Sequence, residues 1–184
     1  VLPVSRTPEL AILEADLRFL SNDNARACAL AEGEMSVQST NYWQKALTFC
    51  QIIKGEKSKA GLSLSLMREL GEADELFLTL AEGLISDEPQ ELPPFSDPSP
   101  LQLAMARVGK VELPGDVISA NPPGVLRAIA LSPTTLLDLR LEAAEGAQSA
   151  GALAEDTIRH LYPSVTFYAE DIANPLSLSD IDSG

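Results

Sequence analysis

Two cysteines, Cys28 and Cys50, are the residues of this 184-residue chain whose chemistry is easiest to specify. The sequence predicts them on consecutive helices, and an antiparallel pair of such helices would hold them at comparable heights. A disulfide needs Cα atoms roughly 4.4–6.8 Å apart. It would stabilise the helix pair by roughly 3 kcal/mol and would imply an oxidising compartment. The alternative is two buried thiols that pack as small apolar residues, and the residues alone leave both open.

His160 is the one histidine of the sequence, so a zinc site or a Cys–His nucleophile would depend on it. Structural zinc takes about four Cys or His ligands, more than two cysteines and one histidine supply. A Cys–His pair would need His160 to reach Cys28 or Cys50 across the whole helical array. Because His160 precedes "LYP" at a predicted helix end, we expect it to interact with the helix dipole. We therefore predict no metal site and no catalytic cysteine.

Neighbouring carboxylates are the remaining candidates for acid–base chemistry, for example Glu14 with Asp16 and Glu155 with Asp156. Residues one or two positions apart do not share a helix face, so these pairs do not form a catalytic dyad. The acidic run "GEADE" at 71–75 fits a helix start, where the dipole favours negative charge. No phosphate-binding glycine loop and no nucleophile elbow is visible. The sequence predicts no catalytic residue and no cofactor.

The composition favours helices over sheets. Leu and Ala are abundant, aromatic residues make up 5% of the chain, and no strand pair with a hairpin turn is visible. The predicted fold class is therefore all-α. The net charge is −14, and basic residues are scattered among acidic ones, so we expect neither nucleic acid nor an anionic membrane as a partner. No apolar run approaches the roughly 20 residues of a transmembrane helix.

Helical spacing and capping signals predict five helices before residue 85. The first begins at Thr7-Pro8, where a hydroxyl can cap and proline fits, and leucines 10, 13, 17 and 20 give it one apolar face. Gly33, Gly55 and Gly71 are expected to end the next three. The alternation "LSLSL" mimics a strand, but the apolar pattern continues and favours a helix. The predicted helices are 7–21, 22–33, 41–55, 56–71 and 74–84.

A proline-rich segment divides the predicted helices into two blocks. The stretch "SDEPQELPPFSDPSP" holds five prolines and is not helical. We predict an N-terminal helical-hairpin block at 1–85, a proline-rich connection at 86–99, a second helical block at 100–162, and an extended tail or truncated continuation at 163–184. The predicted helices of the second block are 100–108, 114–120, 122–131, 134–150 and 153–161.

The stretch "NYWQKALTFCQIIKGEKSKAGLSLSLMRELG" resembles a degenerate tetratricopeptide-type hairpin. Trp43 begins its first helix, Ala46 lies inside it, Gly55 falls at the turn and Ala60 opens the second helix. Residues 133–162 form a second, poorer hairpin. One hairpin cannot bury both its faces, so hairpins stack and bury their leucines and alanines. The expected architecture is a right-handed α-solenoid of antiparallel hairpins, in two blocks joined by the proline-rich connection.

Together with "NARACALAE" and "LRLEAAEGAQSAGAL", this stretch is similar to the superhelical, non-catalytic part of bacterial envelope proteins, such as soluble lytic transglycosylases. The resemblance implies the periplasm or cell envelope, favours a bridge between Cys28 and Cys50, and transfers no catalytic residue. Free thiols at these positions would instead indicate the cytoplasm.

Two functions fit such a fold. The first is a non-catalytic scaffold for protein–protein interaction, as a structural subunit of a bacterial envelope assembly such as a motor or secretion machine. The alternative is an accessory helical domain of a peptidoglycan-acting envelope enzyme whose catalytic part lies outside these residues. Candidate partner contacts are Trp43, Phe95, Phe167 and Tyr168, since aromatic residues are common binding hot spots. Trp43 also fits a hairpin core.

Overall fold

The computed structural model describes residues 7–164 except 73, 89, 96 and 119–121. Within these residues the protein is all-α, with nine α-helices, two short 3-10 turns and no strand. The predicted fold class is therefore confirmed. The helices are α1 (Pro8–Leu20), α2 (Asn24–Met35), α3 (Asn41–Ile53), α4 (Lys57–Glu69), α5 (Glu75–Ser86), α6 (Pro100–Gly109), α7 (Pro123–Ala130), α8 (Leu137–Ser149) and α9 (Glu155–Leu161).

Several helix ends follow from local capping. Thr7 caps α1, and its Oγ1 accepts a hydrogen bond from the N–H of Leu10. Asp74 caps α5, where its carboxylate accepts from the N–H of Phe77 at 3.0 Å. Gly55 and Gly71 follow α3 and α4 with φ of 80° and 85°, a left-handed conformation that glycine adopts without strain. The helix over "LSLSL" is confirmed as part of α4.

Some predicted boundaries are wrong. Gly33 keeps helical geometry, and α2 continues to Met35. The helix expected at 114–120 is absent over the described residues of that range, which hold a single 3-10 turn, η1 (Gly115–Val117). Gly115 weakens a helix there, and Pro122 and Pro123 prevent one from continuing. Likewise α8 begins at Leu137, three residues later than the expected 134.

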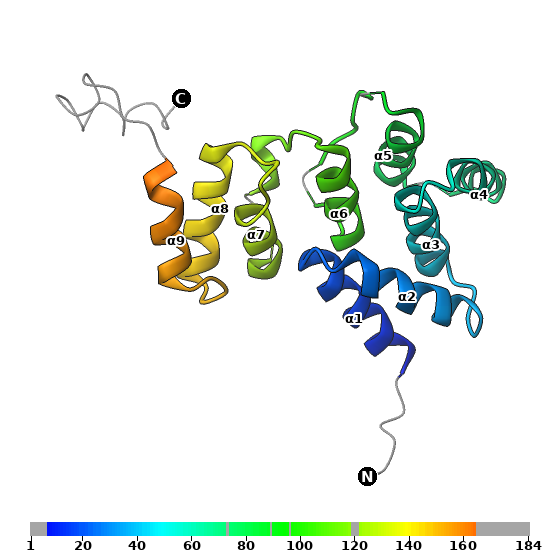
Figure 1. The fold of residues 1–184 in the computed structure, drawn as a ribbon, viewed down its shortest axis with the longest axis horizontal. Helices are drawn as coiled ribbons and strands as arrows, with labels where there is room; N and C mark the ends of the chain where they lie inside the picture. The colour runs from blue at the N-terminus through cyan, green and yellow to red at the C-terminus, as the bar shows by residue number, and fades with distance from the viewer. Residues whose placement is uncertain (1–6, 73, 89, 96, 119–121, 165–184) are drawn as a thin grey trace, which may run out of the picture.

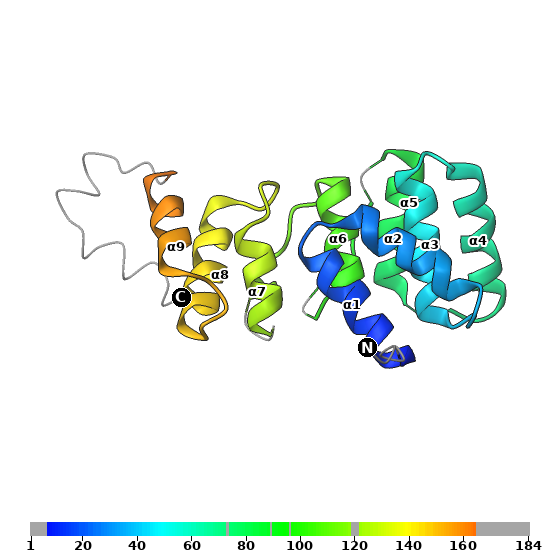
Figure 2. The ribbon, with the colours of Figure 1, turned by 60° about the horizontal axis from the view of Figure 1, so that its bottom comes forward.

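The first six helices pack as a closed group. Each of α2, α3 and α4 packs on the helix before it, α5 packs on α3 and α4, and α6 packs on both α5 and α1. The remaining helices follow in sequence, with α8 on α7 and α9 on α8, while α7 also touches α1. As a result α4 and α9 lie at opposite ends of the molecule (Figures 1 and 2).

The proline-rich connection returns the chain to the first helices. Phe95 within it is buried in the core, and α6, which follows it, packs on α1. The connection thus lies within the group formed by α1–α6, where it joins α5 to α6. The domain boundaries at 85, 99 and 162 stay predictions, and nearly all of the tail at 163–184 lies outside the described residues.

The core of α1–α6 combines large aromatic side chains with alanine. Trp43, Phe49 and Phe77 are among the largest fully buried side chains, and the rings of Phe19 and Phe49 meet edge to face, with centroids 5.9 Å apart. Alanines at 11, 15, 27, 31, 46 and 60 are also fully buried. Small residues of this kind let helix backbones approach closely, so the aromatic rings fill the remaining space.

Candidate interaction surfaces

Cys28 on α2 and Cys50 on α3 form a disulfide, with Cα atoms 5.5 Å apart. Both side chains are buried, so the bridge lies inside the α2–α3 pair, away from solvent. The predicted geometry, two cysteines at comparable heights on neighbouring helices, is satisfied. Neither sulfur is available as a nucleophile in this form.

His160 lies in the last turn of α9, at the opposite end of the molecule from α2 and α3 (Figure 1). Its Nδ1 contacts the backbone oxygen of Asp156 within the same helix. The structure therefore does not bring His160 to Cys28 or Cys50. In the described part of the chain, no three Cys, His, Asp or Glu side chains are grouped so that they could hold a metal ion.

The aromatic residues predicted as partner contacts do not lie on the described surface. Trp43 is 0% exposed and Phe95 is 2% exposed, so a partner that docks on this conformation cannot reach either side chain. The prediction is therefore wrong for these two, because both rings are needed to fill the core. Trp43 has the role that the hairpin-core interpretation gives it. Phe167 and Tyr168 lie outside the described residues.

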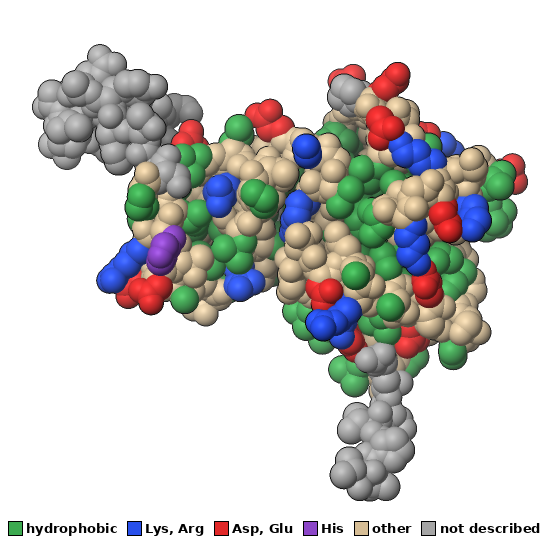
Figure 3. Space-filling view, viewed as in Figure 1, with side chains coloured by type: hydrophobic (Ala, Val, Ile, Leu, Met, Phe, Trp, Pro, Cys, Tyr) green, Lys and Arg blue, Asp and Glu red, His purple; other side chains and the backbone are tan. Residues whose placement is uncertain are grey.

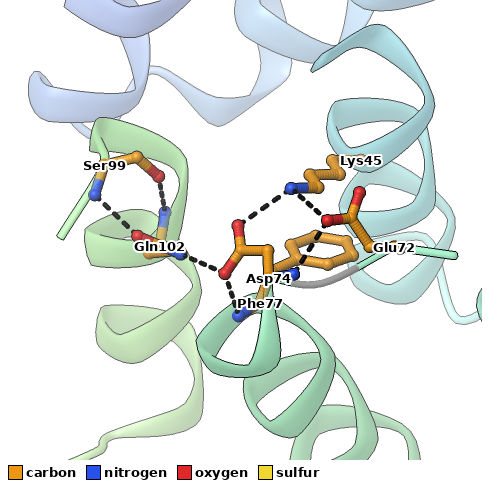
Figure 4. Close-up of polar contacts among 6 residues, drawn as sticks. All are labelled: Lys45, Glu72, Asp74, Phe77, Ser99 and Gln102. Atoms are coloured by element: carbon orange, nitrogen blue, oxygen red, sulfur yellow. Dashed lines mark hydrogen bonds and ion pairs between the residues drawn. The ribbon is translucent and has the colours of Figure 1, made fainter. Parts of the chain in front are cut away.

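A cluster of charged side chains joins α3 to the segment before α5 (Figure 4). Lys45 Nζ lies 2.9 Å from Asp74 Oδ2 and 3.1 Å from Glu72 Oε1, and 5.5 Å from the centre of the Phe77 ring. Burial raises the pKa of Glu72, but hydrogen bonds from the Asp74 N–H and the Asn41 side chain, together with the nearby Lys45, outweigh this effect, so the net pKa is lowered. Glu72 is thus held ionised beside the ammonium group.

The same cluster continues to α6. Gln102 Nε2 donates to Asp74 Oδ1 at 2.8 Å, and Gln102 forms a reciprocal capping box with Ser99. The carboxylate of Asp74 therefore serves α3, α5 and α6 together. Since Lys45 pairs with both Glu72 and Asp74, and none of the three lines the groove between α3, α5 and α6, we interpret the cluster as a structural clamp.

Asp16 and Tyr42 make a second contact between distant helices. The Tyr42 hydroxyl on α3 donates to Asp16 Oδ1 on α1 at 2.7 Å. Burial raises the pKa of Asp16, and the hydrogen bond from Tyr42 partly opposes this rise. This pair fixes α1 against α3.

The exposed surface of α4 carries a leucine stripe, defined by Leu62, Leu66 and Leu70. The buried face of α4 consists of Ala60, Leu64 and Met67, whereas the three leucines of the stripe are between 55% and 74% exposed. The expectation that hairpin packing would bury these leucines is therefore wrong. α4 is apolar on two sides, and its neighbours α3 and α5 cover one of them.

A second leucine stripe, defined by Leu10, Leu13 and Leu17, lies on α1. These side chains are between 49% and 56% exposed, while α1 buries Ala11, Ala15 and Phe19. The predicted leucine face exists, but it faces outward because α1 packs on α2 and α6 through its small residues. Single exposed leucines are ordinary on protein surfaces, but leucines aligned along a helix are typical of an interface.

A groove of about 780 Å³ lies between α3, α5 and α6. Hydrophobic side chains gather in this region of the space-filling view (Figure 3). The groove has no signal in the local sequence, since its lining comes from four separate segments of the chain. Its apolar lining consists of Ile52, Ile53, Leu80, Leu84, Leu92, Met105, Val108 and Val111.

Comparison of the chain with protein-family models, with curated proteins and with solved structures gave no match. None of the described helices combines the length and the apolar composition that crossing a bilayer requires. The class of protein that fold and surfaces define is thus an α-helical array with unpaired apolar helix faces.

Proposed function

We propose that this chain is a non-catalytic helical scaffold that binds other proteins through the outward faces of its first six helices. The observation that carries the proposal is the pair of leucine stripes on α1 and α4, on helices that already bury a separate apolar face. Fully burying one leucine stabilises by about 1.5–3 kcal/mol relative to full exposure. Aligned stripes therefore favour association with another apolar surface.

In this proposal the helices form a right-handed α-solenoid, and the protein is a structural subunit of a larger envelope assembly, such as a motor or secretion machine. The stepwise packing of α2 on α1, α3 on α2, α4 on α3 and α9 on α8 supports a stacked helical array. The disulfide between Cys28 and Cys50 supports an oxidising compartment such as the bacterial periplasm.

The proposal is tested by affinity capture of the full-length protein from its native envelope. The wild type is compared with the variant Leu62→Gln/Leu66→Gln/Leu70→Gln and with Leu10→Gln/Leu13→Gln/Leu17→Gln. Glutamine keeps helix propensity but removes apolar surface. The matched control changes the polar end of the molecule, Glu155→Gln/Arg159→Gln on α9, where side chains are already exposed.

We expect specific proteins to copurify with the wild type and the control, and to be lost from at least one stripe variant. Capture of the same proteins by all four forms would contradict the proposal. So would turnover of a glycan or small molecule by the purified chain without any stable protein partner.

A further inference from the structure

The walls of the groove between α3, α5 and α6 restrict which kind of partner can enter it. Its sides are largely α-helices, whose backbone N–H and C=O groups are already bonded within each helix. The rest of the lining, at 87, 88, 90, 92 and 110–112, is irregular and holds no described strand. An extended peptide would therefore find no sheet edge to pair with, and its own backbone groups would be buried unpaired. A helix brings its backbone groups already paired. The groove therefore favours a helical segment with apolar residues on one face.

Three helix carboxyl ends border this groove. Ile53 ends α3, Ser86 ends α5 and Gly109 ends α6, and the lining includes residues from each of these last turns. A helix carboxyl end carries about half a negative charge. The one amino end at the groove is that of α4, at Lys57. The backbone alone thus makes the groove electronegative.

The charged side chains act in the same direction. The lining contains three carboxylates, Asp87, Glu88 and Glu112, against the two amines Lys57 and Lys110. Lys57 is already ion-paired with Asp87. The net charge of the whole chain, −14, adds a field that attracts cationic partners at longer range.

We infer that this groove receives an amphipathic helix of a protein partner, with apolar residues at i, i+3 or i+4, and i+7, and with Lys or Arg beside them. This inference rests on the proposed scaffold function and adds the chemistry of one partner segment. Apolar side chains of the segment pack on Ile53, Leu84 and Val108, which line the groove and are at least partly exposed. Its basic side chains lie near Glu88 and Glu112.

The inference is tested by selection from a displayed library of random peptides of about 16 residues, or four helical turns, against the immobilised full chain. Enriched peptides are synthesised, and their affinities are measured for the wild type and for Ile53→Gln/Val108→Gln. Both positions are partly exposed in the groove, so the fold should persist, and far-UV circular dichroism checks that it does. The matched control is Leu62→Gln/Leu66→Gln on α4.

We expect enriched peptides with the helical apolar spacing and a positive net charge. Their affinity should fall about tenfold in the groove variant, as for an interface hot spot, and remain unchanged in the α4 control. In Glu88→Gln/Glu112→Gln it should fall by about threefold and lose part of its salt dependence.

Enrichment of acidic or non-periodic peptides, or of no peptide at all, would overturn the inference. Binding that is lost in the α4 control but kept in the groove variant would also overturn it, while leaving the scaffold function intact. Failure of the scaffold function itself would appear separately, as native capture that is unchanged in both stripe variants.

Discussion

The two ends of the molecule, α4 and α9, present opposite chemistry to solvent. α9 exposes Glu155, Asp156, Arg159 and His160, and Arg159 is ion-paired with Glu155 at 2.6 Å. α4 exposes its leucine stripe. A stacked helical array needs a polar outer face where it terminates. In the proposed array, α9 therefore has the surface expected of a terminal helix, and α4 has the surface expected of a helix that a partner covers.

The group α1–α6 is also the more strongly cross-linked part of the described chain. A disulfide ties α2 to α3, and the Lys45 cluster ties α3 to α5 and α6. Among the described residues of α7–α9, the corresponding contacts are single hydrogen bonds, such as Arg140 Nε to the Ala130 carbonyl and Tyr162 Oη to Glu145. The leucine stripes thus lie on the helices that are more strongly cross-linked. In the proposed scaffold, this limits the conformational entropy that is lost when a partner binds.

The largest effect is expected from Trp43→Ala. Removing a fully buried aromatic side chain should lower the free energy of unfolding by about 3–5 kcal/mol, because Trp43 is part of the core. Leu62→Ala, the matched exposed position, should change it by less than about 0.5 kcal/mol. Urea denaturation followed by far-UV circular dichroism measures both, since Trp43 is the single tryptophan. A larger loss for Leu62→Ala would reverse the assignment of buried and exposed faces.

The next effect is expected from Cys28→Ala/Cys50→Ala, or from reduction of the wild type. Loss of the bridge should cost about 3 kcal/mol through loop closure in the unfolded chain. Relative to the wild type, the variant should lose more hydrogen-exchange protection in α2 and α3 than in α8, because the disulfide joins α2 to α3. Two free thiols in freshly isolated native protein, seen by non-reducing mass analysis, would contradict both the bridge and the oxidising compartment.

Some features of these helices can be predicted from the local sequence, and others cannot. Helix limits were predictable at Thr7, Gly55 and Asp74, because caps act within a few residues. Which face of α1 is buried was not predictable, because Ala11 and Ala15 recur at the same helical spacing as Leu13 and Leu17. Close approach of α2 and α6 selects the alanine face, and that approach is a non-local property. The paired alanines were the one available signal.

Among the candidate sites, too, some could be predicted from the sequence and others could not. The pairing of Cys28 with Cys50 could be expected from two cysteines on consecutive helices. Trp43 and Phe95 are candidate partner contacts on the ground that aromatic residues are common at interfaces, yet a chain with so few aromatics uses them in the core. For Trp43 the hairpin pattern also predicts a core position. The groove could not be predicted, since Ile53, Leu84 and Val108 meet only after α3, α5 and α6 have packed.

A smaller effect is expected from the charged cluster, and it should depend on pH. Because the folded-state pKa of Glu72 lies below its ordinary value of 4.5, its ionised form stabilises the fold above that value. The stabilisation is lost as pH falls through 4.5 toward the lower folded-state pKa. Glu72→Gln should therefore destabilise by about 1 kcal/mol at pH 7, and this difference from the wild type should shrink in acid. A difference that is independent of pH would contradict the assignment.

The substitution Asp16→Asn, in the same group of helices, should change the pH dependence of stability in the opposite direction. Burial raises the pKa of Asp16 above its ordinary value of 3.8, so ionisation opposes folding. Relative to Asp16→Asn, the wild type should therefore gain stability as the pH falls from the raised folded-state pKa of Asp16 to its ordinary value in the unfolded chain. Denaturation midpoints measured from pH 7 down to acid pH should give slopes of opposite sign for the two substitutions.

The smallest change in stability, and the sharpest test of the two ends, is expected from Leu62→Lys/Leu66→Glu. Both side chains are exposed, so the free energy of unfolding should stay within about 0.5 kcal/mol of the wild type. Binding of a hydrophobic fluorescent dye should nevertheless fall, because α4 then resembles the polar face of α9. Glu155→Gln/Arg159→Gln should leave dye binding unchanged, since α9 offers no leucine stripe. Equal dye binding by the wild type and the α4 variant would mean that the apolar surface available to partners lies elsewhere, on the leucine stripe of α1 or in the groove between α3, α5 and α6.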